Sequence, residues 1–429
     1  MLFLRALRLF VVNTLTRTSP TMDLRSGTPV WLLEAGSLRE WPDLEGPRDA
    51  DVVVVGAGIS GALAALHLAE AGFDVLVLDR REAGRGSTLA STGLLQYEID
   101  NSLVELGERI GREPAARAYR RSVAAVEQLG ALVATLGHEC GFAWRPSLYL
   151  GVTGQDAALL EAEARVRRAC GIEVELLDAR DIRAQYPFQR PAAIRSALSA
   201  EVDPLRLTLS LLRRAESLGA TIRTGPCAEL ATIETGRMAS VVTTTAGHVV
   251  RAGHVVFATG YESERYLPQP IGQLLSTYAM ATEPEASLED WDDRCLVWET
   301  ARPYLYLRTT PSGRVIVGGE DERITDADAR DALIGGKCAD LVRRARGIWP
   351  SLRLAPACAW GGFFGETPDG LPVIGTPPGM PRTHFALGYG GNGITFSLIA
   401  AQIITASITG HADPDAELFR FGRPSLSAS

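Results

Sequence analysis

A glycine-rich turn between two apolar segments constrains the fold of this 429-residue chain more than any other feature. Val52 to Val55 form an unbroken β-branched run, which is typical of a parallel strand buried on both faces. Gly56, Gly58 and Gly61 follow at G-x-G-x-x-G spacing. A missing Cβ at these positions permits a tight turn, close approach of the backbone to a pyrophosphate and close packing of helix on strand. The segment therefore predicts a strand, a turn and a helix whose N-terminus faces phosphate.

The residues after this turn complete a nucleotide-binding unit. Apolar residues recur at helical spacing from Ile59 to Ala69, Gly72 ends the helix, and a second strand runs to Leu78. Asp79 then lies at the strand tip, where a carboxylate can bind the ribose hydroxyls of an adenosine. That carboxylate would repel a 2′-phosphate, so NADP is disfavoured although two arginines follow it. The alternative is a glycine turn that serves packing alone.

Composition narrows the class of protein. The formal net charge of −8 argues against a nucleic-acid partner, because binding to phosphates needs a basic face. The six cysteines show no C-x-x-C spacing, so we expect no metal site, no redox pair and a reduced, cytoplasmic chain. No apolar segment is long enough to span a membrane, and integral membrane insertion is not expected.

The N-terminal segment LFLRALRLFVVNTL is apolar but is interrupted by Arg5 and Arg8. One interpretation is a basic amphipathic helix that lies on a membrane surface. We favour the other, in which Met22 is the natural start of the protein. Residues 1–21 are then not part of the natural chain.

Several further elements can be placed by pattern. The loop from Gly84 to Gly93 could offer amides and hydroxyls to a pyrophosphate. Residues 103–136 and 156–170 show helical periodicity and are interpreted as an inserted cap. Short alternating runs from Leu274 to Gly319 predict antiparallel strands that could wall a substrate pocket.

Four segments occur in an order that resembles the FAD-dependent D-amino-acid oxidase superfamily, which includes glycine, sarcosine and γ-glutamylputrescine oxidoreductases. They are VVVVGAGISGALAALHLA, EVDPLRLTLSLLRRAESLGA, VVFATGY and TPDGLPVIG…ALGYGGNGI. The motif style is closest to the γ-glutamylputrescine and glycine oxidoreductases, and the resemblance covers about residues 30–422. It implies an α/β fold, with a Rossmann-like FAD-binding domain of the glutathione-reductase type and an inserted mixed-sheet α+β substrate domain.

The resemblance also suggests how the chain is divided. We expect an N-terminal extension in residues 1–29, FAD-binding parts in 30–100, 195–265 and 358–429, the last with the C-terminal helix, and substrate-domain parts in 101–194, which includes the helical cap, and 266–357, which forms the antiparallel sheet.

FAD is the implied cofactor, and its expected contacts can be carried over residue by residue. The resemblance assigns them to Gly56, Gly58, Ile59, Ser60, Gly61, Asp79, Arg80, Ser87, Thr88, Ser91, Thr259, Gly260, Gly390, Gly391, Asn392, Gly393 and Ile394. The last five match a segment at the pyrimidine edge of the flavin. Reduction places negative charge there, and free amides at a helix start stabilise an anion. The alternative for these five is a glycine turn before a core helix.

The flavin is expected to be bound non-covalently. In the sarcosine branch a cysteine seven residues before the aspartate that matches Asp369 carries the flavin, and here that position is Gly362.

The chemistry that the resemblance implies is oxidation of a C–H bond next to an amine nitrogen, giving an imine that water hydrolyses. The partner is then a small-molecule amine or amino acid, with O2 or another electron acceptor. The residues expected to contact substrate are Tyr304, Tyr306, Arg308, Tyr97 and Glu98. The first three alternate along one strand and so share a face, although each tyrosine could simply be packed.

Phe364 bears on the substrate class. In the glycine enzymes an arginine at this position binds the substrate carboxylate, and a phenylalanine cannot replace that contact. The surrounding W-G-G sequence resembles the γ-glutamylputrescine branch, so we expect amines to be better substrates than small α-amino acids. Arg308 could supply a relocated clamp, which keeps amino acids open. Two other functions remain open, a flavin-binding subunit with secondary or no catalysis and a membrane-surface dehydrogenase that reduces quinone.

Overall fold

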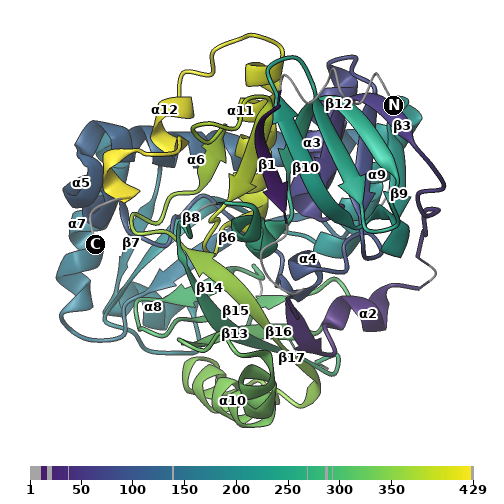
Figure 1. Ribbon diagram of the computed structural model, residues 1–429. Helices are drawn as coiled ribbons and strands as arrows, with labels where there is room; N and C mark the ends of the chain where they lie inside the picture. Colours follow the sequence, from purple (N-terminus) through teal and green to yellow (C-terminus); the bar gives the residue numbers. More distant parts are fainter. Residues whose placement is uncertain are drawn as a thin grey trace, which may run out of the picture.

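A computed structural model describes residues 11–16, 22–36, 38–137, 140–267, 269–285, 288–291 and 293–426 of the chain. These residues form two large sheets, one above the other in Figure 1. The first sheet is flanked by α3 and α9 in that view, and the second has α10 beneath it.

The first sheet is parallel at its centre. Parallel pairs join β12 to β3, β3 to β4, β4 to β9 and β12 to β19, with an antiparallel extension at one edge. In spatial order its strands are β1 (Val11–Thr16), β10 (Leu230–Gly236), β11 (Ser240–Thr244), β12 (Val249–Phe257), β3 (Arg48–Val55), β4 (Val75–Asp79) and β9 (Thr221–Thr224); β19 (Thr383–Leu387) pairs with β12 and β18 (Val373–Gly375).

The second sheet is mostly antiparallel. Its strands follow the order β2 (Arg25–Gly27), β17 (Pro356–Glu366), β13 (Gln273–Thr282), β16 (Val315–Glu322), β15 (Leu305–Thr309), β14 (Leu296–Glu299), β6 (Ala143–Leu150), β8 (Ala192–Glu201) and β5 (Leu94–Gln96), with β7 (Glu175–Asp178) beside β8. The pair β14–β6 is parallel, so the sheet is mixed. The expected fold class, a Rossmann-like domain with a mixed-sheet domain, is confirmed.

Helices cover both sheets. Helix α3 (Ile59–Glu70) lies between α9 (Pro204–Ser217) and α11 (Gly393–Ile408), and its small and branched side chains allow close packing. Helix α10 (Ala327–Ile348) packs on β13, β16 and β17. The other helices are α2 (Val30–Glu34), α4 (Ser87–Ala90), α5 (Leu103–Ile110), α6 (Arg112–Thr135), α7 (Asp156–Ala169), α8 (Ala179–Gln185), α12 (Ala416–Phe419), η1 (Pro226–Ala228), η2 (Gly260–Tyr266) and η3 (Pro424–Leu426).

Three sequence-based expectations differ from the structure. The periodic stretch 103–136 is two helices, because Gly111 adopts φ 95° and breaks it. The expected boundaries at 195 and 358 fall inside β8 and β17, which both belong to the second sheet. Val11–Thr16 forms a strand antiparallel to β10, not part of a surface helix, while residues 1–10 and 17–21 lie outside the described residues.

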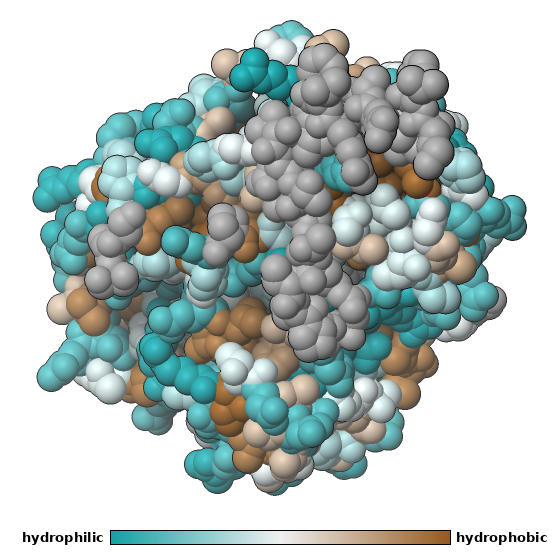
Figure 2. Space-filling model, viewed as in Figure 1, coloured by the Kyte–Doolittle hydropathy of each residue, from teal (hydrophilic) through white to brown (hydrophobic). Residues whose placement is uncertain are grey.

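On the face of the molecule in Figure 2, hydrophilic residues predominate and hydrophobic residues occur in smaller groups between them. Among the described residues, no helix has the length and apolar character that crossing a membrane requires.

Candidate functional site

A cavity of about 300 Å³ lies between the two sheets. Its lining combines the ends of the parallel strands, the starts of α3 and α11, and side chains from β13 to β17. This size falls at the lower end of ligand pockets, which span roughly 300–1,000 Å³. The cavity meets the carboxyl ends of parallel strands, where α/β folds bind nucleotides.

The glycine turn after β3 shapes one wall. Gly56 adopts φ 112°, and a Cβ there would overlap the carbonyl of Ala258. A Cβ on Gly61 would overlap the carbonyl of Gly56, so this glycine lets α3 pack against the strand. Gly58 lies at the start of α3, and a Cβ there would approach the hydroxyl of Thr88 to 3.0 Å. The third glycine of the motif, Gly61, is thus a packing requirement, whereas Gly58 faces the cavity.

Hydroxyl groups line the turn beneath the cavity. The Oγ1 atom of Thr88 accepts a hydrogen bond from the Ile59 amide at 3.0 Å. The Oγ atom of Ser87 is buried and has no hydrogen-bond partner among the described residues. A buried hydroxyl without a partner is costly unless a ligand supplies one.

Asp79 lies at the end of β4, as expected, and lines the cavity. Its carboxylate accepts hydrogen bonds from the amides of Ala57 at 2.7 Å and Arg81 at 2.9 Å. Burial raises the pKa of Asp79, while these two amides favour the charged form. The carboxylate therefore braces the glycine turn and still borders the cavity.

Glu262 is a functional candidate that the sequence reasoning missed. Its carboxylate forms ion pairs with Arg80 at 2.9 Å and Arg81 at 2.8 Å, and it lies on η2 directly after β12. Burial raises the pKa of Glu262, but the Arg81 hydrogen bond and the charges of both arginines outweigh burial and hold the pKa below its ordinary value. Thr259 and Gly260 lie shortly before it in the chain and line the same wall. The sequence feature that could have identified Glu262 is its position two residues after Gly260 of the Thr-Gly turn.

The start of α11 forms the opposite wall. Asn392 occupies the N-cap position, and its side-chain amide donates to the carbonyls of Gln96 at 3.0 Å and Glu98 at 2.6 Å. The first amides of the helix therefore have no side-chain cap. Gly391 donates its amide to Asp100 at 2.8 Å, and Gly390, Gly393 and Ile394 also line the cavity. Uncapped amides at a helix start favour an anionic group.

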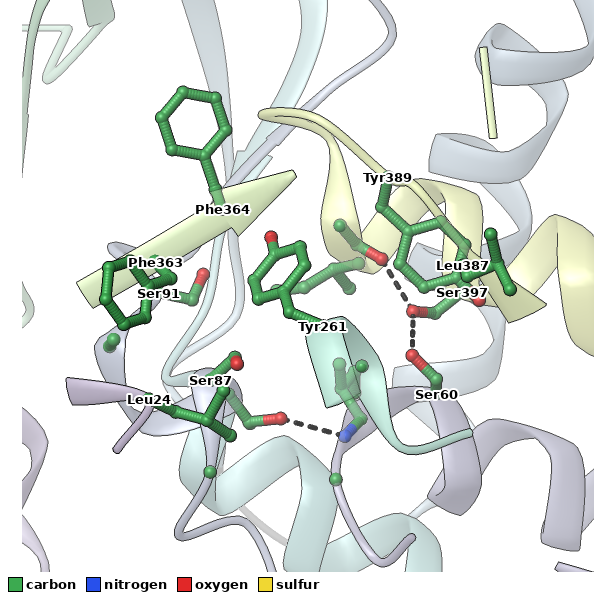
Figure 3. Close-up of a pocket in the computed structure, with 18 of the residues that line it drawn as sticks. Leu24, Ser60, Ser87, Ser91, Tyr261, Phe363, Phe364, Leu387, Tyr389 and Ser397 are labelled. Carbon is green, nitrogen blue, oxygen red and sulfur yellow. Dashed lines mark hydrogen bonds between the residues drawn. The ribbon is translucent and has the colours of Figure 1, made fainter. Parts of the chain in front are cut away.

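Figure 3 shows the centre of the cavity between these walls. The hydroxyls of Ser60 on α3 and Ser397 on α11 lie 2.8 Å apart and join the two helices. Tyr261 lies between these serines and the phenylalanines of β17, and Tyr389 lies beside Ser397. Both tyrosines line the cavity, and Ser91 lies on its far side with Phe363.

Aromatic and polar side chains of the second sheet line the remaining part. Tyr306 on β15 pairs across the strands with Trp298, and the Trp298 ring stacks on Tyr149 at 3.7 Å between centroids. The hydroxyl of Tyr304 donates to the carbonyl of Asp100 at 2.7 Å.

Asp321 on β16 lines the same part of the cavity. Burial raises the pKa of its carboxyl to about 6, and a hydrogen bond with Thr277 opposes that shift. Phe364 lines the cavity as well. Trp298, Thr277 and Asp321 could not be anticipated, since strands distant in sequence bring them together.

Two residues expected to contact substrate do not line the cavity. Arg308 is fully buried, and its guanidinium donates to the carbonyls of Thr92, Gly93 and Val202 at 3.1, 2.7 and 2.9 Å. Although it follows Tyr306 at strand spacing, these carbonyls hold it away from the cavity. The expectation that Arg308 faces a substrate is therefore wrong.

The other residue is Tyr97, which is buried and accepts a hydrogen bond from Arg167 at 3.2 Å. Tyr97 follows the end of β5 and does not line the cavity, whereas the next residue, Glu98, does. The Glu98 carboxylate contacts Ser147 at 2.9 Å and Arg167 at 3.4 Å. Of the five residues expected to contact substrate, Tyr304, Tyr306 and Glu98 thus border the cavity.

The geometry fits a dinucleotide joined to a ring system. The glycine turn, Asp79 and the free Ser87 hydroxyl form one end, and the uncapped start of α11 faces the other. The side-chain nitrogen of Gln96, also in the lining, is buried without a partner among the described residues. Orphaned donors at both ends match the phosphates and polar ring edge of such a cofactor.

Comparison with known proteins agrees with this geometry. A family model for DAO, FAD dependent oxidoreductase, matches residues 51–407. Glycine oxidase of Bacillus licheniformis is 26% identical over 370 residues, covering 84% of this chain and 93% of that protein. Gamma-glutamylputrescine oxidoreductase of Escherichia coli strain K12 is 25% identical over 377 residues, covering 85% and 84%.

Solved structures share the fold. The crystal structure of glycine oxidase from Geobacillus kaustophilus has a TM-score of 0.72 at 19% identity and covers 85% of this chain and 96% of that one. L-alpha-glycerophosphate oxidase from Mycoplasma pneumoniae, solved with FAD bound, also has a TM-score of 0.72, at 14% identity and with 85% and 97% coverage. With the family model spanning most of its length, this chain belongs to the DAO family of FAD-dependent oxidoreductases.

Proposed function

We propose that this enzyme oxidises the C–N bond of a small amine or amino acid. The observation that carries the proposal is one continuous cavity. It joins the nucleotide-binding turn to a part lined by Tyr304, Tyr306, Trp298 and Phe364, which we call the aromatic chamber. Relatives named for glycine, D-amino acids and gamma-glutamylputrescine support the substrate class. FAD supplies hydride acceptance from the carbon next to nitrogen, and the resulting imine then hydrolyses.

The residues of this chain have separable roles in this proposal. Gly58, Ser87 and Thr88 would hold the pyrophosphate, and Asp79 would hold the adenosine ribose. The amides of Gly393 and Ile394 would stabilise negative charge at the flavin ring edge.

The aromatic chamber would exclude water and keep the substrate amine neutral. Tyr304, Tyr306, Trp298 and Phe364 supply apolar surface on which a small substrate can be oriented. The electron acceptor is O2 or another oxidant.

We further propose that FAD is bound non-covalently. Among the described residues no cysteine lines the cavity, and Cys358 lies buried in the core. Acid precipitation of the purified yellow protein should leave the colour in the supernatant. A yellow pellet would contradict this proposal.

Anaerobic titration of the FAD-loaded protein with a panel of primary amines, secondary amines and amino acids tests the reaction. At least one of them should bleach the flavin absorbance, and the corresponding aldehyde, ketone or keto acid should form with one equivalent of ammonia or amine. Flavin that is retained but not reduced by any of them would identify a binding subunit instead.

A further inference from the structure

Three carboxylates line the part of the cavity next to the aromatic chamber. They belong to Glu98, Asp100 and Asp321. Glu98 pairs with Arg167 at 3.4 Å and accepts a hydrogen bond from Ser147. Asp100 accepts the Gly391 amide at 2.8 Å. Both therefore have a partner within the protein.

The third carboxylate, Asp321, has a hydroxyl partner but no cationic one. Thr277 hydrogen-bonds to it, the charges of Asp100 and Glu366 act on it unfavourably, and the charge of Arg302 acts on it favourably without forming an ion pair. None of the ion pairs formed within the described part of the chain includes Asp321, which is half-buried. A half-buried carboxylate without an ion-pair partner carries a desolvation cost, and a bound cation would reduce that cost.

The arginines that line the cavity lie at its nucleotide-binding end and form no ion pair with Asp321. Within the described residues they are Arg80, Arg81 and Arg265, and all three form ion pairs with Glu262 beside the nucleotide-binding turn. Phe364 also lines the aromatic chamber, and its side chain is uncharged. Arg302 does not line the cavity, but its guanidinium carbon lies 3.3 Å from the centroid of the Tyr304 ring and it donates to the Asp100 carbonyl. Within the lining of this chamber a substrate carboxylate would meet Asp321 and Asp100, so the field there favours a cation.

The rings around Asp321 suit a cation as well. Trp298 and Tyr306 are cross-strand neighbours, and Tyr306 pairs with Gly318 on the same strand as Asp321. Stacking on Tyr149 fixes the Trp298 ring. An alkylammonium group beside such rings gains cation–π attraction in addition to the ion pair.

We propose that Asp321 is a specificity-determining residue that binds a second, cationic nitrogen of the substrate, separate from the neutral amine that is oxidised, so that the cavity takes diamines that lack a carboxylate. This inference rests on the proposed amine oxidation and names its substrate class. It assigns Asp321 to substrate binding and not to the hydride transfer.

A permanently charged probe separates binding from reaction. Butyltrimethylammonium has no nitrogen lone pair and cannot be oxidised to an imine, so its binding to the FAD-loaded protein can be measured by calorimetry and by the shift of the flavin absorbance. We expect Asp321→Asn to weaken this binding by about tenfold to a hundredfold, the range for loss of a charged partner. Asp321→Glu should keep most of the affinity.

Glu366→Gln provides the matched control. Glu366 is a carboxylate whose charge reaches Asp321 but which does not line this cavity, so its variant should change probe affinity less than threefold. FAD content should match the wild type in all three variants. Equal probe binding by wild type and Asp321→Asn, with FAD retained, overturns the inference.

Selectivity gives a second readout. Asp321→Asn should raise KM for a diamine at least tenfold with a smaller change in kcat, and it should lower KM for glycine or D-alanine. A diamine that reduces the wild-type flavin while Asp321→Asn leaves its KM unchanged would contradict only the role of Asp321. Failure of every amine and amino acid to reduce the flavin would instead contradict the proposed function, whatever the probe binding shows.

Discussion

Arg308 holds parts of the chain together that lie far apart in sequence. It is fully buried, donates to four main-chain carbonyls, and lies 3.6 Å from the buried carboxylate of Glu201. We predict that Arg308→Leu lowers the free energy of unfolding by about 3–5 kcal/mol, because it leaves these groups unpaired. Urea denaturation followed by circular dichroism measures this change.

Arg251→Leu is the matched control for Arg308. Arg251 is half exposed and lies 3.8 Å from Asp49, so its loss should change stability by less than about 1 kcal/mol. If Arg308→Leu kept normal stability but raised KM for amino acids, Arg308 would contact substrate, as the sequence suggested.

Tyr306 takes its place over β16 because Gly318 has no side chain. A Cβ on Gly318 would overlap the Tyr306 ring, which borders the cavity. We predict that Gly318→Ala displaces the ring and weakens amine binding by about tenfold, while FAD content stays unchanged, since overpacking of this kind costs about 1–3 kcal/mol. Titration of the flavin absorbance with an amine measures the affinity.

A double-mutant cycle checks this coupling between two strands. In a Tyr306→Ala background, Gly318→Ala should have little further effect, because no ring remains to be displaced. Gly335→Ala on α10 serves as a control, since a Cβ there meets open space. Additive effects of the first two substitutions would show that the strands do not couple through this ring.

At the level of elements, the sequence predicted what is local. The unit from β3 to β4 and the start of α11 are each contiguous in the chain, so their glycines and apolar runs could be recognised in the sequence. The break at Gly111 was missed because one glycine is compatible with a helical repeat. The sheet to which β8 belongs, and the meeting of Trp298 with Asp321, depend on strand pairing between distant segments. No local pattern encodes such pairing.

Buried histidines make the stability of the whole molecule depend on pH. His384 on β19 contacts His254 at 3.1 Å, and burial followed by the charge of His254 lowers its pKa to about 3. As the pH falls through about 6.5, the unfolded chain binds a proton that the folded protein does not, so stability is lost on acidification. This site should contribute a loss of about 1.4 kcal/mol between pH 7.5 and 5.5.

The comparison with His384→Asn isolates this contribution from other titrating groups. Asparagine can still hydrogen-bond to Thr376, which lies 3.2 Å from the His384 ring, but it does not titrate. The variant should therefore lose about 1.4 kcal/mol less than the wild type over the same pH interval, measured by urea denaturation. Parallel curves for the two proteins would show that His384 is protonated equally in both states.

FAD should stabilise the molecule as a unit, because both sheets contribute to its cavity. A ligand that binds only the folded state adds about 2.7 kcal/mol at a concentration one hundred times its dissociation constant. We therefore expect removal of FAD to lower Tm, and added FAD to restore it in proportion to the logarithm of its concentration. Asp79→Ala should need more FAD for the same rise in Tm, because the proposed contact with the ribose would be lost. Differential scanning calorimetry measures both.

Because both sheets line the cavity that would hold FAD, we expect the holoenzyme to unfold in one transition. A second transition that FAD does not shift would show that the substrate sheet unfolds independently of the cofactor.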